Sequence, residues 1–318
     1  MKAGKARCVK LVSTHDSKVG VPMKVKLIIL FAVVSMASAC VFIRMTTAPS
    51  PIIAMYRLGM SAIILLPIVL TKYRKELFSL HLKDIAWFSL GGMLFAIHFM
   101  LYFEAIHNTT VAAGVTLSTT EVFFVALAAY PLFGEKITKK GWLGICLAFI
   151  GCVIVTMDDG LDGGQLYGNL LAIATCIFVA GFTLIGKKCR KGVSNIVYTF
   201  VVCTSGTLTM LVGCMLQNYP LFGYPPVDYY ASLYLAVFPT LLGHGLLSWG
   251  LKYEKATFIS SMKLLIPGAA VLFAWAFLDE PPTWVALVGG VLIISGILYY
   301  NKQKSIAEAI NEPTTIEK

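Results

Sequence analysis

The chain has 318 residues, of which 58% are hydrophobic and 13% are charged, and its mean hydropathy is +0.78. This composition excludes an ordinary soluble domain and indicates a polytopic membrane protein. The formal net charge of +10 would suit nucleic acid or an anionic surface. However, the basic residues lie between apolar segments, so nucleic acid is not an expected partner.

Ten apolar segments follow one another, each close to the 20 or so residues that a helix needs to cross a bilayer. They predict an all-α fold with spans at residues 27–43, 50–70, 85–103, 109–133, 142–157, 169–186, 195–216, 230–250, 257–278 and 284–300. Residues 1–26 form a basic tail, in which Met23 is an alternative start. We expect residues 158–168 to form an acidic, glycine-rich connector outside the cytoplasm. Residues 301–318 are expected to form a cytoplasmic tail, which is polar and disordered from residue 303.

The basic residues predict the orientation of the chain. All but three of the 26 Lys and Arg residues lie in segments that alternate spans place on one side of the membrane. Arg44 ends the first span, while Arg57 and Lys263 lie inside spans. Because cytoplasmic loops carry the excess of Lys and Arg, we expect both termini in the cytoplasm. The eight cysteines show no metal-binding spacing, so we expect neither a metal nor another cofactor.

The two halves of the chain, 27–157 and 169–300, resemble each other. A shift of 145 residues aligns Glu135 with Glu280, and it aligns Gly144 and Gly151 with the glycines of the last span. Five spans per half is an odd number, so the halves must point in opposite directions across the membrane. Inverted repeats of this kind are common in secondary transporters, whose substrate sites lie between the halves. Gly144 and Gly151 share one helix face, where a neighbouring backbone can approach closely.

The pattern resembles the drug/metabolite transporter (DMT) superfamily, in particular its EamA-type ten-helix members. The residues that carry the resemblance are Ser50 and Pro51 leading to Arg57, the stretch 133–138 before Gly144 and Gly151, the stretches 242–244 and 249–253, and 266–267 leading to 278–280. The resemblance covers residues 24–300. It implies a small-metabolite carrier of the inner or plasma membrane, with a central cavity between its halves. Members export or take up amino acids, nucleobase-like compounds, S-adenosylmethionine or drugs.

The chain departs from the family pattern at two positions near the expected cavity. Val122 follows Glu121 where a proline is common, and Ile266 stands where a glutamate often precedes the proline of span nine. Both departures lie close to charged residues, Glu121 and Lys263, that this chain places inside its spans.

Glu121 lies in the middle of about 25 uncharged residues, and an acid at the centre of a bilayer costs roughly 2.5 to 3.5 kcal/mol on insertion scales. It lies in a similar part of its half to Lys263, so an ion pair between them would offset both burial costs. The alternative is that Glu121 binds a substrate ammonium group or a coupling proton. Arg57 lies seven residues into span two, where its planar guanidinium suits a substrate carboxylate or holds the outer half together.

Four further residues are candidates for the substrate site. His98 and His244 lie in the corresponding third and eighth spans. Each is either satisfied by a neighbouring carbonyl group or lines the cavity as part of a proton relay. Tyr102 and Trp249 follow them by four and five residues, as aromatic cavity walls or as residues of the membrane interface.

These features predict a secondary active transporter of a small metabolite, with an amino acid or its derivative as the substrate and a proton as the coupling ion. No phosphate-binding loop of an ATPase is present in the sequence. A membrane enzyme would need catalytic side chains gathered at one face, and the loops are too short to supply them. A channel or a structural membrane protein is the other alternative. A channel would need polar residues repeated along several spans.

Overall fold

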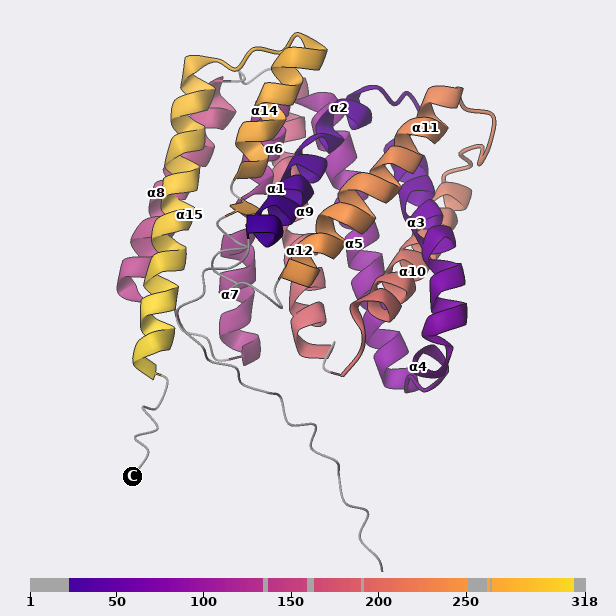
Figure 1. The fold of residues 1–318 in the computed structure, drawn as a ribbon. Helices are drawn as coiled ribbons and strands as arrows, with labels where there is room; N and C mark the ends of the chain where they lie inside the picture. Colours follow the sequence, from indigo (N-terminus) through magenta and orange to yellow (C-terminus); the bar gives the residue numbers. More distant parts are fainter. Residues whose placement is uncertain are drawn as a thin grey trace, which may run out of the picture.

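The structure is a computed structural model that describes residues 23–133, 137–158, 163–189, 192–250, 262–263 and 265–311. The described part is helical, with the helices packed side by side as one bundle (Figure 1). The elements are α1 (Met23–Ala37), α2 (Ala39–Arg44), α3 (Ser50–Lys72), α4 (Arg74–Phe78), α5 (Leu82–Asn108), α6 (Val111–Ser118), α7 (Glu121–Phe133), α8 (Lys139–Asp158), α9 (Gly163–Cys189), α10 (Asn195–Leu216), α11 (Pro226–Leu235), η1 (Ala236–His244), α12 (Gly245–Gly250), α14 (Leu265–Leu278) and α15 (Trp284–Asn311).

Nine helical segments of the described chain are long and apolar enough to span a membrane, and α14 adds a shorter apolar helix. The protein is therefore an all-α integral membrane protein with ten spans. In the described part of the chain, three spans are built from more than one element: α1 and α2 form the first, α6 and α7 the fourth, and α11, η1 and α12 the eighth.

The structure differs from the sequence-based bounds at both polar connections. Helix α9 begins at Gly163, inside the segment 158–168 that we expected to be a connector. Helix α15 continues to Asn311, so the expectation of a disordered tail from residue 303 was wrong for its first part. Residues such as Lys302, Gln303 and Ala307 have high helix propensity, and a helix that leaves the bilayer can continue into water.

The glycine contacts show how the two halves are oriented. A Cβ atom added at Gly144 of α8 would lie 2.6 Å from the carbonyl oxygen of Gly296 on α15, and one at Gly151 would lie 2.7 Å from that of Gly289. As residue numbers rise along α8, the facing numbers fall along α15, so these two repeat counterparts run antiparallel, side by side (Figure 1). The halves are thus inverted repeats, and the predicted close approach at Gly144 and Gly151 is confirmed.

The packing of the other spans follows the same twofold symmetry. Helix α3 packs on α10 and α6 packs on α14, so each of these spans contacts its own counterpart in the other half. The contact between α5 and α9 likewise has its counterpart in the contact between η1 and α1. Two inverted halves packed in this way enclose the space between spans three, four, eight and nine, where the candidate site lies.

The bundle has two opposite faces, the Arg44 face and the Lys72 face. The Arg44 face contains the end of α2, the start of α6 and the segment between α14 and α15. The Lys72 face contains the end of α3, helix α4 and the start of α5. In Figure 1 the Arg44 face is at the top and α4 marks the Lys72 face at the bottom.

Candidate functional site

A cavity of about 390 Å³ lies between the two halves. Its lining includes six of the seven residues that the sequence singled out as substrate-binding: Arg57, His98, Tyr102, Glu121, His244 and Lys263. These residues come from α3, α5, α7, η1 and residues 262–263 before α14. The cavity extends toward the Lys72 face as far as Tyr300 and Asn301 of α15.

Glu121 owes its position to a break in the fourth span. Helix α6 ends at Ser118 and α7 begins at Glu121, with Thr119 and Thr120 between them. The hydroxyl groups of the two threonines donate to carbonyl oxygens one turn back, those of Thr116 at 2.6 Å and Leu117 at 2.7 Å. The same two carbonyl oxygens also accept from the backbone N–H groups of Thr119 and Thr120 at 3.1 Å, so each hydroxyl group adds a second bond at the break. The Glu121 carboxylate then lies at the positive end of α7, where the helix dipole favours a negative charge.

Glu121 and Lys263 line the same cavity from opposite halves, but they do not form an ion pair. Among the described residues there is one ion pair, between Arg44 and Glu280, and it lies outside this cavity. Neither Glu121 nor Lys263 has a hydrogen-bond partner among the residues that the structure describes. An acid and a base inside one cavity are therefore both available to a ligand.

Arg57 is almost completely buried, with 2% of its surface exposed. Its Nε donates a hydrogen bond of 2.8 Å to the Oγ1 atom of Thr240, in η1. Its guanidinium carbon lies 3.9 Å from the centre of the Phe99 ring and 5.6 Å from that of Phe103, both on α5. Within the described chain no carboxylate pairs with Arg57, so the aromatic rings and one threonine are what compensates this buried charge.

His98 is held by three polar contacts with Thr175 of α9, one of which joins its Nδ1 to the Thr175 carbonyl oxygen at 3.3 Å. The Thr175 hydroxyl donates to the His98 carbonyl oxygen at 2.8 Å, and its Oγ1 lies 2.6 Å from the His98 Nδ1. A hydroxyl group has one hydrogen, which is already donated, so Nδ1 must be the donor to Oγ1. In the neutral ring the other nitrogen, Nε2, is then a hydrogen-bond acceptor.

Aromatic rings form much of the cavity wall. Phe95 stacks on Phe182 with ring centres 4.3 Å apart, and Tyr102 stacks on His98 at 6.1 Å. His244, the last residue of η1, meets the Phe95 ring edge-on at 5.8 Å. The cavity thus combines a few charged groups with apolar and aromatic walls, as small-molecule sites commonly do.

A cluster of bonds closes the bundle at the Arg44 face. The Arg44 guanidinium lies 2.8 Å from the Glu280 carboxylate and donates to the carbonyl oxygens of His107 and Thr109. The second Glu280 oxygen accepts from the backbone N–H of Val111 at 3.2 Å. One ion pair therefore joins the first span, the end of the third, the start of the fourth and the segment before the tenth.

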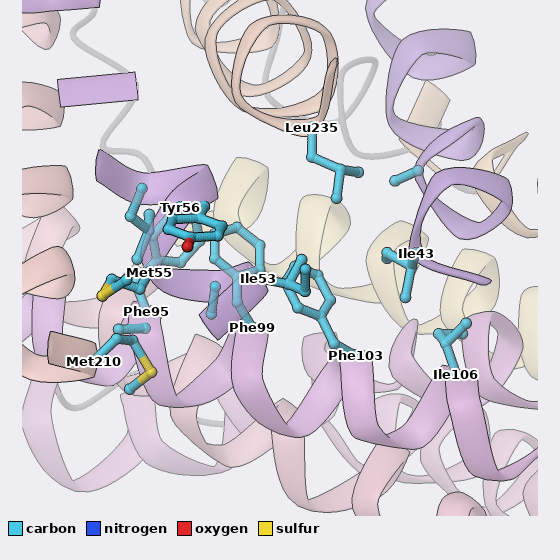
Figure 2. Close-up of a cluster of buried hydrophobic side chains, with 14 of the residues drawn as sticks. Ile43, Ile53, Met55, Tyr56, Phe95, Phe99, Phe103, Ile106, Met210 and Leu235 are labelled. Atoms are coloured by element: carbon cyan, nitrogen blue, oxygen red, sulfur yellow. The ribbon is translucent and has the colours of Figure 1, made fainter. Parts of the chain in front are cut away.

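Below this cluster, packed side chains separate the cavity from the Arg44 face. Phe99, Phe103 and Ile106 follow one another along α5, with Ile43 and Leu235 directed toward them (Figure 2). Asp228, at the start of α11, is fully buried and accepts hydrogen bonds from Thr47 and Ala48 in the loop before α3. These contacts fix the eighth span to the first two.

Trp249 lies elsewhere. It packs in a cluster with α1 residues such as Ile29 and Val33, and it is not among the residues that line the cavity. Its spacing of five residues from His244 crosses the junction from η1 to α12, so an estimate based on a regular helix misplaced it.

Sequence reasoning missed two groups of residues that shape the cavity. Phe99 and Phe103 hold Arg57, and their spacing of four residues on one face of span three was a usable signal. Thr240 and Thr175 hold Arg57 and His98 across helices. Their role depends on which helices pack together, so no local pattern indicates it.

Comparisons with known proteins agree with this architecture. The model of the EamA-like transporter family matches residues 23–157 and 166–301, one repeat in each half. The chain is 29% identical over 234 residues to the "Uncharacterized transporter YetK" of Bacillus subtilis, covering 70% of both chains. It is 28% identical over 203 residues to a "Probable amino-acid metabolite efflux pump" of Escherichia coli, covering 59% of this chain and 66% of that one.

A solved crystal structure shares the fold, with a TM-score of 0.61 and 15% identity, covering 90% of this chain and 99% of the other. The family match accounts for both halves of the bundle, and the cavity lies between them. With ten spans in two inverted repeats, the chain belongs to the EamA-like transporter family.

Proposed function

We propose that this protein is a secondary active transporter that carries an amino acid or an amino-acid derivative through the central cavity by alternating access. The observation that carries the proposal is the cavity itself, which holds Glu121, Arg57 and Lys263 within aromatic and apolar walls. A zwitterion needs an acid and a base at one site. The Escherichia coli relative is named a probable amino-acid metabolite efflux pump, which supports this class of substrate.

Arg57 and Glu121 take different parts of the substrate in this proposal. Arg57 receives the carboxylate, because a planar guanidinium matches a carboxylate with two parallel hydrogen bonds. Glu121 receives the ammonium group or a coupling proton. Lys263, His98, His244 and Tyr102 line the rest of the cavity and select among substrates by charge, hydrogen bonding and ring stacking.

In this proposal the structure is the state that is closed at the Arg44 face. The ion pair between Arg44 and Glu280 and the packed side chains beneath it separate the cavity from that face. The excess of Lys and Arg supports an orientation in an inner or plasma membrane with the opposite, Lys72 face toward the cytoplasm. Transport then requires this closure to alternate with closure at the Lys72 face.

The test is solute counterflow in proteoliposomes, using each of the twenty common L-amino acids with and without a pH gradient. A carrier gives saturable counterflow, whereas a channel does not saturate in this way. Glu121→Gln removes the exchangeable proton and the negative charge, so proton-driven transport should be lost while the amount of folded protein stays the same. Unchanged transport in Glu121→Gln would remove this residue from the mechanism.

Glu104→Gln is the matched control, because Glu104 is a second acid within a span. It contacts Ser50 and Asn108 near the Arg44 face and does not line the cavity. Loss of transport in both variants would point to a general requirement for intramembrane acids rather than to a role of Glu121 in the cavity.

A further inference from the structure

The eighth span is interrupted by the π-helical segment η1, from Ala236 to His244. Pro239 lies inside it and has no N–H group to give to a regular helix. The next residue, Thr240, donates its hydroxyl hydrogen to the carbonyl oxygen of Leu235, five residues earlier, at 2.9 Å. Single-turn π segments in helices are often found at functional sites, and this one borders the cavity through Pro239 and His244.

The Thr240 hydroxyl group therefore donates its hydrogen to one fixed partner. Its single hydrogen points to Leu235, so the Oγ1 atom acts as an acceptor toward Arg57. Thr240 is 3% exposed, which leaves little access for water to replace it. The π-helical register thus delivers one fixed acceptor to the Nε atom of Arg57, from the opposite half of the protein.

Arg57 is restrained in two further ways. The Phe99 ring lies against the guanidinium at 3.9 Å, which fixes the plane of the group. Among the described residues, no hydrogen bond or ion pair involves the two terminal nitrogens, Nη1 and Nη2. A guanidinium can grip a carboxylate through its Nε side or through its terminal edge. With Nε bonded to Thr240, the terminal edge is the one that remains.

We propose that Thr240 is a positioning and specificity-determining residue, which holds Arg57 so that its terminal Nη1 and Nη2 edge receives the carboxylate of the transported molecule. This inference rests on the proposed function, and it adds how the carboxylate is chosen. A primary amide offers one acceptor and one donor where a carboxylate offers two acceptors. A fixed two-donor edge therefore selects the acid over its amide.

A purely structural role for Thr240 predicts a different result. If Thr240 only satisfied a buried N–H group, its loss would lower stability and reduce transport of every substrate by the same factor. If it positions Arg57, its loss changes the ratio between acid and amide substrates. The ratio is therefore the measurement that separates the two roles.

The experiment measures competition for counterflow by each of the twenty L-amino acids and by its α-amide, in wild-type protein, Thr240→Val, Thr240→Ser and Arg57→Lys. Valine keeps the shape of threonine without the hydroxyl, and serine keeps the hydroxyl. We expect wild type and Thr240→Ser to prefer the acid by about tenfold or more, as charge-assisted two-point contacts do. In Thr240→Val and Arg57→Lys the preference should fall to about twofold or less, mainly through a higher KM for the acid.

Phe99→Leu keeps the experiment decisive if Thr240→Val does not fold. It removes the ring that fixes the guanidinium plane and leaves the Thr240 hydroxyl in place, so it should also reduce the preference for the acid. The proposal is overturned if Thr240→Val or Phe99→Leu transports with the wild-type acid-to-amide ratio, and the carrier function would still stand. It is also overturned if wild-type protein gives saturable counterflow without preferring acids. The absence of saturable counterflow in wild type would overturn the proposed function itself.

Discussion

The cluster around Arg44 and Glu280 is the contact that we expect to hold the Arg44 face closed. Arg44→Ala removes the ion pair and the bonds to the carbonyl oxygens of His107 and Thr109 in one step. Glu280→Ala removes the pair and the acceptor for the Val111 N–H, whereas Glu280→Gln keeps neutral hydrogen bonds. The closed state should therefore be weakened more by the two alanine variants than by Glu280→Gln.

The expected magnitude follows from the exposure of the pair. The side chains of Arg44 and Glu280 are 22% and 31% exposed, so solvent screens the ion pair and limits it to about 1 kcal/mol. The hydrogen bonds to the two carbonyl oxygens add about 1 kcal/mol more after the same screening. A loss of about 2 kcal/mol raises the population of the opened state by about 30-fold relative to the closed one.

A cysteine in the cavity can report this change without any substrate. Ser118 lines the cavity, and Ser118→Cys is nearly isosteric. A membrane-impermeant thiol reagent is added from the Arg44 face, and the rate of labelling is compared with that of the same chain without the introduced cysteine. Labelling should become about 30-fold faster with Arg44→Ala. Arg74→Ala, which removes an arginine stacked on Phe78 at the Lys72 face, is the matched control.

Restoring the pair with reversed charges provides a second criterion. The double variant Arg44→Glu with Glu280→Arg should label more slowly than either single reversal, because it restores an attractive pair. Equal labelling in wild type, Arg44→Ala and Glu280→Ala, with the cysteine still reactive from the Lys72 face, would refute a role of this cluster in closing the cavity.

Three other predictions concern packing and polar contacts. Gly144→Ala and Gly289→Ala each place a Cβ atom 2.6 Å from a facing backbone or side-chain atom. Each should therefore lower the free energy of unfolding by about 1 to 3 kcal/mol. Gly213→Ala is the control, because nothing lies within 4 Å of its added Cβ, and it should change thermal stability little. Asp228→Asn keeps one oxygen for the Thr47 and Ala48 N–H groups, but it removes the negative charge and the oxygen that accepts from the Thr47 hydroxyl group. It should lower the thermal unfolding temperature, with a cost of about 1 to 3 kcal/mol, and an unchanged unfolding temperature would contradict the described loop contact. Thr175→Val removes the nearer of the two acceptors of His98 Nδ1, the hydroxyl oxygen at 2.6 Å, and leaves the backbone carbonyl oxygen at 3.3 Å. The ¹⁵N NMR signals of the His98 ring should therefore shift from one tautomer toward a mixture, whereas Thr175→Ser should keep the single tautomer.

The family, the all-α fold and the ten spans could be predicted from the sequence because they depend on local features. Hydrophobic length defines each span. The repeated glycines 144, 151, 289 and 296 mark the faces on which α8 and α15 meet. Span length and glycine spacing can be read from the sequence without knowing which helices are neighbours.

The site could be predicted only in part, for a physical reason. Glu121, Arg57 and Lys263 stand out because a charge within a span is costly, and the sequence therefore points to residues that need water or protein around them. The residues that hold these groups in place could not be predicted in the same way. Thr240 contacts Arg57 across 183 residues of sequence and Thr175 contacts His98 across 77, so these contacts arise from tertiary packing rather than from any local pattern.

Two of the irregular segments in the spans explain why charge and cavity occur together. A regular helix satisfies its own backbone, and a break or a π-helical turn within lipid would leave polar groups unpaired. The break at Thr119 and Thr120 and the π-helical segment η1 both border the cavity, where side chains and solvent can compensate such groups. The same surroundings lower the cost of Glu121 at the start of α7 and of Arg57 beside Thr240. Irregular backbone and charged side chains within the membrane thus both require a polar space, and the two inverted halves provide it between them. The candidate site lies in this space.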